Sequence, residues 1–180
     1  MKKVILFLII LVILGFAGCY AWVNMGLSQA VSEKTLNISY DEFMYDENIQ
    51  RLDLQMQKTY EGGKFFDKCT VYEDRRISNS IEEKVTITVD NSTKEIEEIS
   101  IHFDVDSNEE ILSAQLTASL YATFFSSAID KNITKDANEN ITNMILALVE
   151  TGDMDSLTLH GVEYSVGMID GYAFVITPEK

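Results

Sequence analysis

The sequence contains little cysteine and almost no proline. Of its 180 residues two are cysteines, Cys19 and Cys69, and Pro178 is the single proline. Two cysteines do not make a disulfide framework, and Cys19 lies inside a long apolar run. We therefore expect no disulfide and interpret Cys69 as a small buried apolar residue. One proline and nine glycines also argue against a low-complexity or disordered stalk.

Positive charge is scarce as well. The chain has 14 Lys and Arg against 29 Asp and Glu, which gives a net charge of −15. Lys2 and Lys3 precede the apolar run, so the rest of the chain, without these two positive charges, carries −17. Such a chain repels the phosphates of DNA and RNA, and we predict no nucleic-acid partner. The acidic surface suits solubility and attracts cationic partners or divalent ions.

The sequence lacks the spacings that assemble a catalytic or zinc site. His102 and His160 are its only histidines, and HxxxH, HExxH, CxxC and GxSxG do not occur. Zinc needs three or four ligands, and a serine nucleophile needs a histidine beside it. The acid pair Asp153 and Asp155 suits glycosidase chemistry only if the fold sets the right separation, and an ordinary polar loop is the simpler interpretation.

An acidic segment, residues 104–110 (DVDSNEE), resembles the start of a calcium loop. Oxygen ligands at alternate positions are what a hard cation needs. The EF-hand pattern fails, however, because Glu109 stands where its glycine belongs and Gln115 where its bidentate glutamate belongs. The end of a strand followed by a capped helix is the favoured interpretation. We predict no catalytic residue, no metal or cofactor, and no identifiable small-molecule ligand.

One apolar run dominates the N-terminal part. Residues 4–23 (VILFLIILVILGFAGCYAWV) contain no charge, Asn, Gln or Pro, and about twenty residues match the roughly 30 Å hydrocarbon core of a bilayer. Lys2 and Lys3 lie at one end and Tyr20 and Trp22 at the other. The sequence therefore predicts a single-pass membrane segment with a cytoplasmic N-terminus and an extracytoplasmic domain.

Two alternatives remain for this run. A cleaved signal peptide has a similar charged and apolar pattern and would give a secreted protein. The residues Phe16-Ala17-Gly18-Cys19 also resemble the lipobox of bacterial lipoproteins, which implies lipidation of Cys19 and a lipid-anchored domain. All three interpretations export the same domain. We divide the chain into an anchor or signal sequence at 1–23, a tether at 24–38 and a domain at 39–180.

Helical and strand periodicities alternate irregularly along this domain. Capping-box spacings predict helices over 41–59 and 108–129, and a third helix begins near Asp136. Apolar alternation predicts a weak strand at 69–76, a hairpin over 84–90 and 96–105, and a closing meander from Leu157 to Ile176 that turns at Asp170-Gly171. The 108–129 helix has a wide apolar face and is expected to be the central core helix.

Runs of strands and runs of helices indicate an α+β fold. We predict an N-terminal transmembrane helix followed by one domain, in which an antiparallel sheet of five to six strands packs against about three helices. The hairpin at 84–105, the helix pair, and the closing strands around 159–165 and Asp170-Gly171 resemble small ectodomains of uncharacterised membrane-anchored or lipidated proteins of Gram-positive bacteria. The resemblance covers roughly the last hundred residues and implies an exported location but no activity.

These patterns favour a non-enzymatic binding or interaction module of the cell envelope. Its expected partners are the membrane, through residues 4–23, and another envelope protein. The alternative is a surface hydrolase that uses acidic residues assembled by the fold. A concave pocket holding two or more acids with raised pKa values would distinguish the hydrolase.

Overall fold

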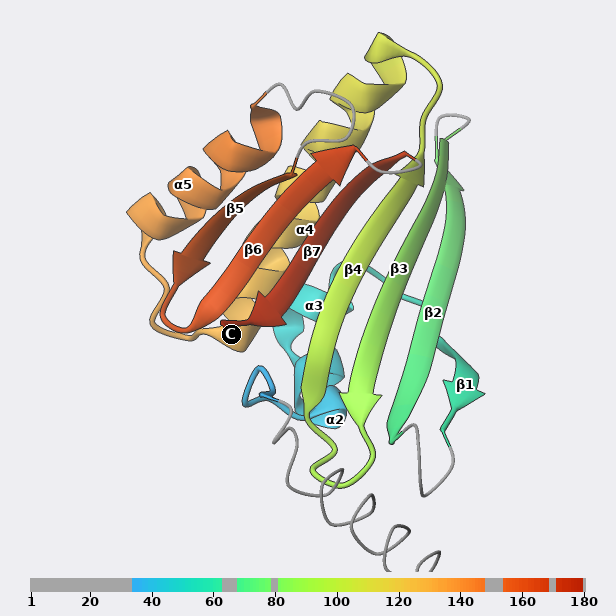
Figure 1. Cartoon of the computed structure of the whole chain (residues 1–180), viewed down its shortest axis with the longest axis vertical. Helices are drawn as coiled ribbons and strands as arrows, with labels where there is room; N and C mark the ends of the chain where they lie inside the picture. The colour runs from blue at the N-terminus through green and yellow to red at the C-terminus, as the bar shows by residue number, and fades with distance from the viewer. Residues whose placement is uncertain (1–33, 63–67, 79–80, 148–153, 169–170, 180) are drawn as a thin grey trace, which may run out of the picture. The chain divides into compact units, whose positions relative to one another are not determined.

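The computed structural model describes residues 34–62, 68–78, 81–147, 154–168 and 171–179. Residues 35–180 form one compact unit. The compact unit is α+β, with an antiparallel sheet of order β1-β2-β3-β4-β7-β6-β5 and helices on one side of that sheet (Figure 1). The strands are β1 (Gln57–Glu61), β2 (Cys69–Ser78), β3 (Ile81–Asp90), β4 (Ile96–Asp104), β5 (Met154–Leu159), β6 (Val162–Met168) and β7 (Tyr172–Pro178), and the helices are α2 (Tyr40–Tyr45), α3 (Glu47–Gln50), α4 (Asn108–Ile129) and α5 (Lys135–Leu146).

The predicted architecture is wrong in two respects. The sheet has seven strands rather than five to six. The helix predicted at 41–59 is replaced by α2, α3 and the edge strand β1. Within the described residues no helix is long and apolar enough to cross a membrane, and residues 4–23, where we predicted a transmembrane helix, lie outside the described residues.

Two aspartates account for the broken helix. Asp46 adopts an extended backbone (φ −63°, ψ 135°), so it ends α2. Its carboxylate then accepts a hydrogen bond from Asn48 N at 2.9 Å and begins α3. Asp53 has a φ of 50°, in the left-handed region, which turns the chain out of the helical path before β1. The apolar spacing across 49–60 therefore does not form one helix, because α3 ends at Gln50 and the left-handed backbone of Asp53 turns the chain toward β1.

The two long helices begin where hydroxyl side chains cap them. Ser107 accepts from Glu110 N and starts α4, and the predicted helix at 108–129 is confirmed. Thr134 accepts from Ala137 N at 3.2 Å and starts α5, close to the predicted start near Asp136. The predicted hairpin and the closing meander are also confirmed, as β3 with β4 and as β5, β6 and β7. The core of the unit includes Leu36 and Ile38, which we had assigned to the tether.

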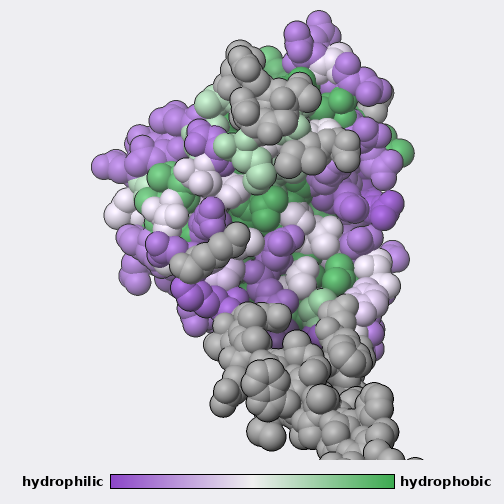
Figure 2. Space-filling model, viewed as in Figure 1, coloured by the Kyte–Doolittle hydropathy of each residue, from purple (hydrophilic) through white to green (hydrophobic). Residues whose placement is uncertain are grey.

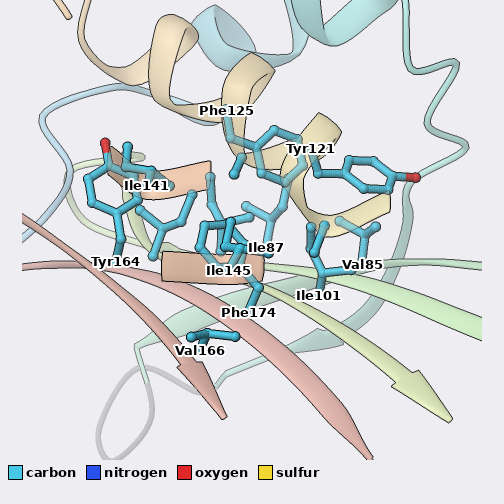
Figure 3. Packing of buried hydrophobic residues seen from close by; sticks show 14 of the residues in the cluster. Val85, Ile87, Ile101, Tyr121, Phe125, Ile141, Ile145, Tyr164, Val166 and Phe174 are labelled. Atoms are coloured by element: carbon cyan, nitrogen blue, oxygen red, sulfur yellow. The ribbon is translucent and has the colours of Figure 1, made fainter. Parts of the chain in front are cut away.

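The hydrophobic core lies between the sheet and its helices. Alternate residues of the central strands point toward α4 and α5, whose Phe125, Ile141 and Ile145 are fully buried against them (Figure 3). The strand residues in this layer include Val85, Ile87, Ile101, Tyr164, Val166 and Phe174. This one-sided burial follows from the two-residue period of the strands, which sends every second side chain to the helices.

The other face of the sheet is not covered by the described helices. The register aligns Thr86, Ser100, Val175 and Ser165 in one row across four strands of this face. Figure 2 shows this side of the molecule, where a small hydrophobic centre is surrounded by hydrophilic side chains. Polar residues on the open face are what the alternating strands predicted.

Candidate functional site

The two histidines lie at opposite ends of the sheet. His102 pairs with Ala173. Ala173 also pairs with Gly167 of β6, which lies opposite Met154 at the start of β5. His160 lies in the turn at the far end of β5, six residues beyond Met154, the partner of Gly167, or roughly 20 Å along the strand. Within the described ranges no group of three His, Cys, Asp or Glu side chains is close enough to hold a metal ion.

The acidic segment 104–110 forms a helix cap in the described structure. Glu110 Oε2 accepts a hydrogen bond from Asp106 N at 2.7 Å, and Ser107 Oγ accepts from Glu110 N at 3.3 Å. The backbone hydrogen bond from Asp106 lowers the pKa of Glu110. The side chains of this segment satisfy the first turn of α4, as expected of a capping box.

The acid pair considered in the sequence, Asp153 and Asp155, falls only partly within the described residues. Asp155 is exposed on β5, where its carboxylate accepts from Ser156 N at 2.9 Å, and Asp153 lies outside the described residues. The carboxyls with a clearly shifted pKa in the described part of the chain are all lowered, and they are Asp46, Glu61, Asp90, Glu110 and Asp130. A carboxyl acting as a general acid needs a raised pKa, so these groups do not support the hydrolase alternative.

The contacts of Asp130 show why the pKa of such a carboxyl is lowered. Its Oδ2 lies 2.5 Å from Nδ1 of His160, and its Oδ1 accepts from Asn132 N at 2.8 Å. The hydrogen bond with His160 is the main reason that the pKa of Asp130 is lowered. The pair ties the turn between β5 and β6 to the loop between α4 and α5.

A polar network fills the core side of β2 and β3. Arg76 Nε donates to Asp74 Oδ2 at 2.7 Å, and Arg76 Nη1 donates to the carbonyl of Leu52 at 2.8 Å. The Tyr121 hydroxyl donates to the buried carboxylate of Glu83. Burial, followed by this hydrogen bond, raises the pKa of Tyr121. The network fixes the segment after α3 to the sheet, and sequence reasoning missed it because its members are far apart in the chain.

A groove beside β1 touches the edge of this network. Its volume is about 430 Å³, and its lining is polar: Asp53, Gln55, Gln57, Thr59, Glu73, Asp74, Arg75 and Arg76. Asp74 in this groove is held by Arg76 and by Gln55 N, at 2.7 and 3.1 Å. Its carboxylate is therefore engaged in structural contacts rather than presented to a substrate.

Cys69 lies at the start of β2 with intermediate exposure, so the expectation that it is buried is only partly met. Cys19, the predicted lipidation residue, lies outside the described residues.

The outward side of α4 is the unexpected feature of the domain. Leu112, Leu116 and Leu120 are 56%, 57% and 51% exposed, although the sequence pattern placed them in the core. They recur every four residues, so they form a stripe along the side of the helix that faces away from the sheet. The core side of α4 is made instead by Ala114, Ala118, Tyr121, Ala122 and Phe125.

Small hydroxyl residues continue this stripe toward the C-terminal end of α4. Ser119, Thr123 and Ser127 each follow a stripe leucine by seven residues, nearly two helical turns, and so lie on the same side. Their hydroxyls donate to the carbonyls four residues earlier, at 2.8, 2.9 and 2.8 Å. We call these three residues together with the three leucines the leucine face.

The leucine face has the properties of a surface that is buried against another molecule. No charged residue occurs between Glu110 and Asp130, in a chain whose net charge is −15. The three hydroxyls have partners within the helix, so covering them leaves no donor unsatisfied. A helix that is apolar on both sides is normally covered on both sides.

Comparisons of the chain with protein-family models, with curated proteins and with solved structures found no match. The resemblance to Gram-positive ectodomains therefore stays a prediction. The leucine face was visible in the sequence as part of a wide apolar face. Sequence reasoning did not separate its outward leucines from the core because the position of the sheet was not known.

Proposed function

We propose that this protein is a non-enzymatic binding module of the cell envelope, which uses the leucine face of α4 to dock an apolar protein surface. The observation that carries the proposal is the half-exposed stripe of Leu112, Leu116 and Leu120 on α4, which carries no charge after Glu110. Exposed apolar stripes rimmed by polar residues mark protein-binding surfaces. The pKa values of Asp130 and Asp46 are lowered, which does not suit a general acid.

Membrane attachment through residues 4–23 is part of this proposal. The apolar run and the lysines before it favour an extracytoplasmic domain on a single-pass segment, with lipidation at Cys19 or secretion as alternatives. The intact mass of the membrane-extracted protein distinguishes them. A full-length mass supports the spanning form, a mass beginning at diacylated Cys19 supports the lipoprotein, and a shorter unlipidated chain supports secretion. Recovery of the protein in the cytoplasm contradicts all three.

Docking at the leucine face is tested by site-specific photo-crosslinking in living cells. A photoreactive residue at Leu116 is expected to form adducts with protein at a yield well above that of the same residue at Ile77. Ile77 is the matched control because it is an 81% exposed apolar residue on β2 rather than on α4. Equal or absent adducts at the two positions would contradict a docking role for this face.

A further inference from the structure

We propose that the occupant of the leucine face is a second copy of this chain, packed with the two α4 helices antiparallel. The inference rests on the proposed docking role and names the partner. It starts from the order of bulky and small residues on the face. The leucines occupy its N-terminal half and the small hydroxyl residues its C-terminal half.

An antiparallel pairing makes the face complementary to itself. A two-fold axis between Ser119 and Leu120 places Leu112 opposite Ser127 of the second copy and Leu116 opposite its Thr123. Leu120 then faces Ser119. Each leucine of one helix therefore meets a small residue of the other, as in helix pairs that pack bulky side chains against small ones. A two-fold interface requires such a self-complementary patch.

Hydrogen bonding permits this burial. The hydroxyls of Ser119, Thr123 and Ser127 already donate within their own helix, so the leucines of the second copy do not strip them of partners. Because these hydroxyls are bonded within the helix, the leucine face has few polar groups that need hydrogen bonds from water, as a buried surface requires.

Electrostatic repulsion between two acidic copies is weakest where the surface carries no charge, and this favours the leucine face as the contact. Each chain has a net charge of −15, so most approaches of two copies bring acidic side chains together. The stretch between Glu110 and Asp130 carries no charge. At each end of the pairing Glu109 comes opposite Asp130 of the second copy. Salt screens this repulsion, so we expect the dimer to become stronger as ionic strength rises.

The size of the face predicts a weak dimer. From Leu112 to Ser127 it extends about 22 Å along the helix. A standard interface buries about 800 Å² on each partner, more than one helix face of this length supplies. Attachment of both copies to one membrane would raise their effective concentration and compensate for the small area.

Cysteine cross-linking tests the pairing. In full-length chains with Cys69→Ser, L112C and S127C proteins carrying different tags are co-expressed and treated in membranes with a short bis-maleimide. We expect a cross-link that joins position 112 of one variant to position 127 of the other, identified by the mass of the joined peptides, and no cross-link at these two positions when either variant is expressed alone. Cross-linking of L112C to itself would indicate a parallel arrangement and overturn the antiparallel dimer.

The oligomeric state supplies an independent test. The detergent-solubilised full chain is measured by analytical ultracentrifugation at low and high salt, with Leu116→Glu as the variant and Ile77→Glu as the control. The dimer fraction is expected to rise with salt, to vanish in L116E and to persist in I77E. A wild-type protein that stays monomeric at high salt and at the highest concentration reached, or a dimer unaffected by L116E, overturns the proposal.

The cross-linking experiment also separates this inference from the proposed function. If L112C and S127C do not join each other but Leu116 forms photo-adducts with a different protein, the dimer is overturned and docking at the leucine face stands. If neither position is cross-linked to protein, both proposals fail. Circular dichroism of each variant serves as the control that the fold is retained, and only folded variants are compared.

Discussion

The guanidinium of Arg76 lies against the carboxylate of Asp74, with 2.7 Å between Nε and Oδ2, on the core side of β2. Asp74 is 6% exposed, and it also accepts a hydrogen bond from Gln55 N at 3.1 Å. Burial opposes the charge of Arg76, but the hydrogen bond from its guanidinium to Asp74 and nearby anionic groups raise the pKa of Arg76 overall. This pair joins the segment between α3 and β1 to the sheet.

Removing Arg76 is expected to destabilise the domain strongly. Arg76→Ala leaves the Asp74 carboxylate buried without its cation, which costs about 3 kcal/mol in the free energy of unfolding. Arg75→Ala is the control, because Arg75 is an exposed neighbour whose ion pairs with Glu73 and Glu82 are worth less than about 1 kcal/mol. Urea denaturation of both variants measures the difference. Equal stabilities would contradict a structural role for the Asp74–Arg76 pair.

Removing one hydroxyl tests the contact between α4 and β3. Tyr121→Phe deprives the buried Glu83 carboxylate of a donor, and we expect a loss of about 1–3 kcal/mol. Tyr45→Phe, at an exposed tyrosine of α2, is expected to leave stability unchanged. Thermal and urea unfolding compare the two. A neutral Y121F would mean that the carboxylate finds another donor.

Gly171 is expected to tolerate no side chain. Its φ is 117°, and a Cβ atom there would lie 2.4 Å from the carbonyl oxygen of Phe103 and 3.0 Å from the ring of His102. Gly171→Ala should therefore cost more than about 2 kcal/mol through strain and overlap. Gly161→Ala is the matched control, with a φ of 81° and open space, and should cost about 1 kcal/mol. Unfolding midpoints in urea give the order.

The Asp130–His160 pair predicts a dependence of stability on acid. The pKa of Asp130 is lowered in the folded protein, so its stabilisation is complete above the ordinary carboxyl pKa and is lost as pH falls through the folded pKa. Asp130→Asn should cost about 0.2–1 kcal/mol near neutral pH and nothing at low pH. Urea unfolding of both proteins between pH 2 and 7 measures this convergence. A constant difference would exclude the carboxylate charge as its cause.

The leucine face is expected to be dispensable for folding. Leu116 is 57% exposed, so Leu116→Glu should change the stability of the monomer by less than about 0.5 kcal/mol. Phe125→Ala, on the core side of the same helix, should cost about 3–5 kcal/mol because it opens a cavity. Denaturation at low protein concentration compares them. A large loss in L116E would show that the leucine supports the fold rather than a partner.

Much of the fold was readable from local sequence. The capping-box spacing of Ser107 and Glu110 predicted the start of α4, and the alternation of Val85, Ile87 and Val89 predicted β3. These features depend on capping and on the two-residue strand period, which act between near neighbours in the chain. Because the sequence lacks the spacings of zinc ligands and of a serine nucleophile, the functional prediction did not favour zinc-dependent or serine-dependent catalysis.

Local sequence could not show where a helical pattern is interrupted. The residues between Ile49 and Tyr60 keep an apolar spacing compatible with a helix, yet the chain turns at Asp53 and continues as an edge strand. Asp46 is held by Lys131, far away in sequence, and that contact favours a break between α2 and α3. Long-range contacts of this kind override helical spacing.

The sequence by itself determined the acidic character of this protein, its apolar N-terminal run and its succession of strands and helices, because these follow from composition and from contacts between near neighbours. Only the tertiary structure decided which side of α4 is buried. Leu116 and Phe125 belong to the same apolar pattern, but the sheet packs against Phe125 and leaves Leu116 in solvent. The position of the sheet relative to the helix is set by packing between segments far apart in the chain, and so the leucine face became visible only in three dimensions.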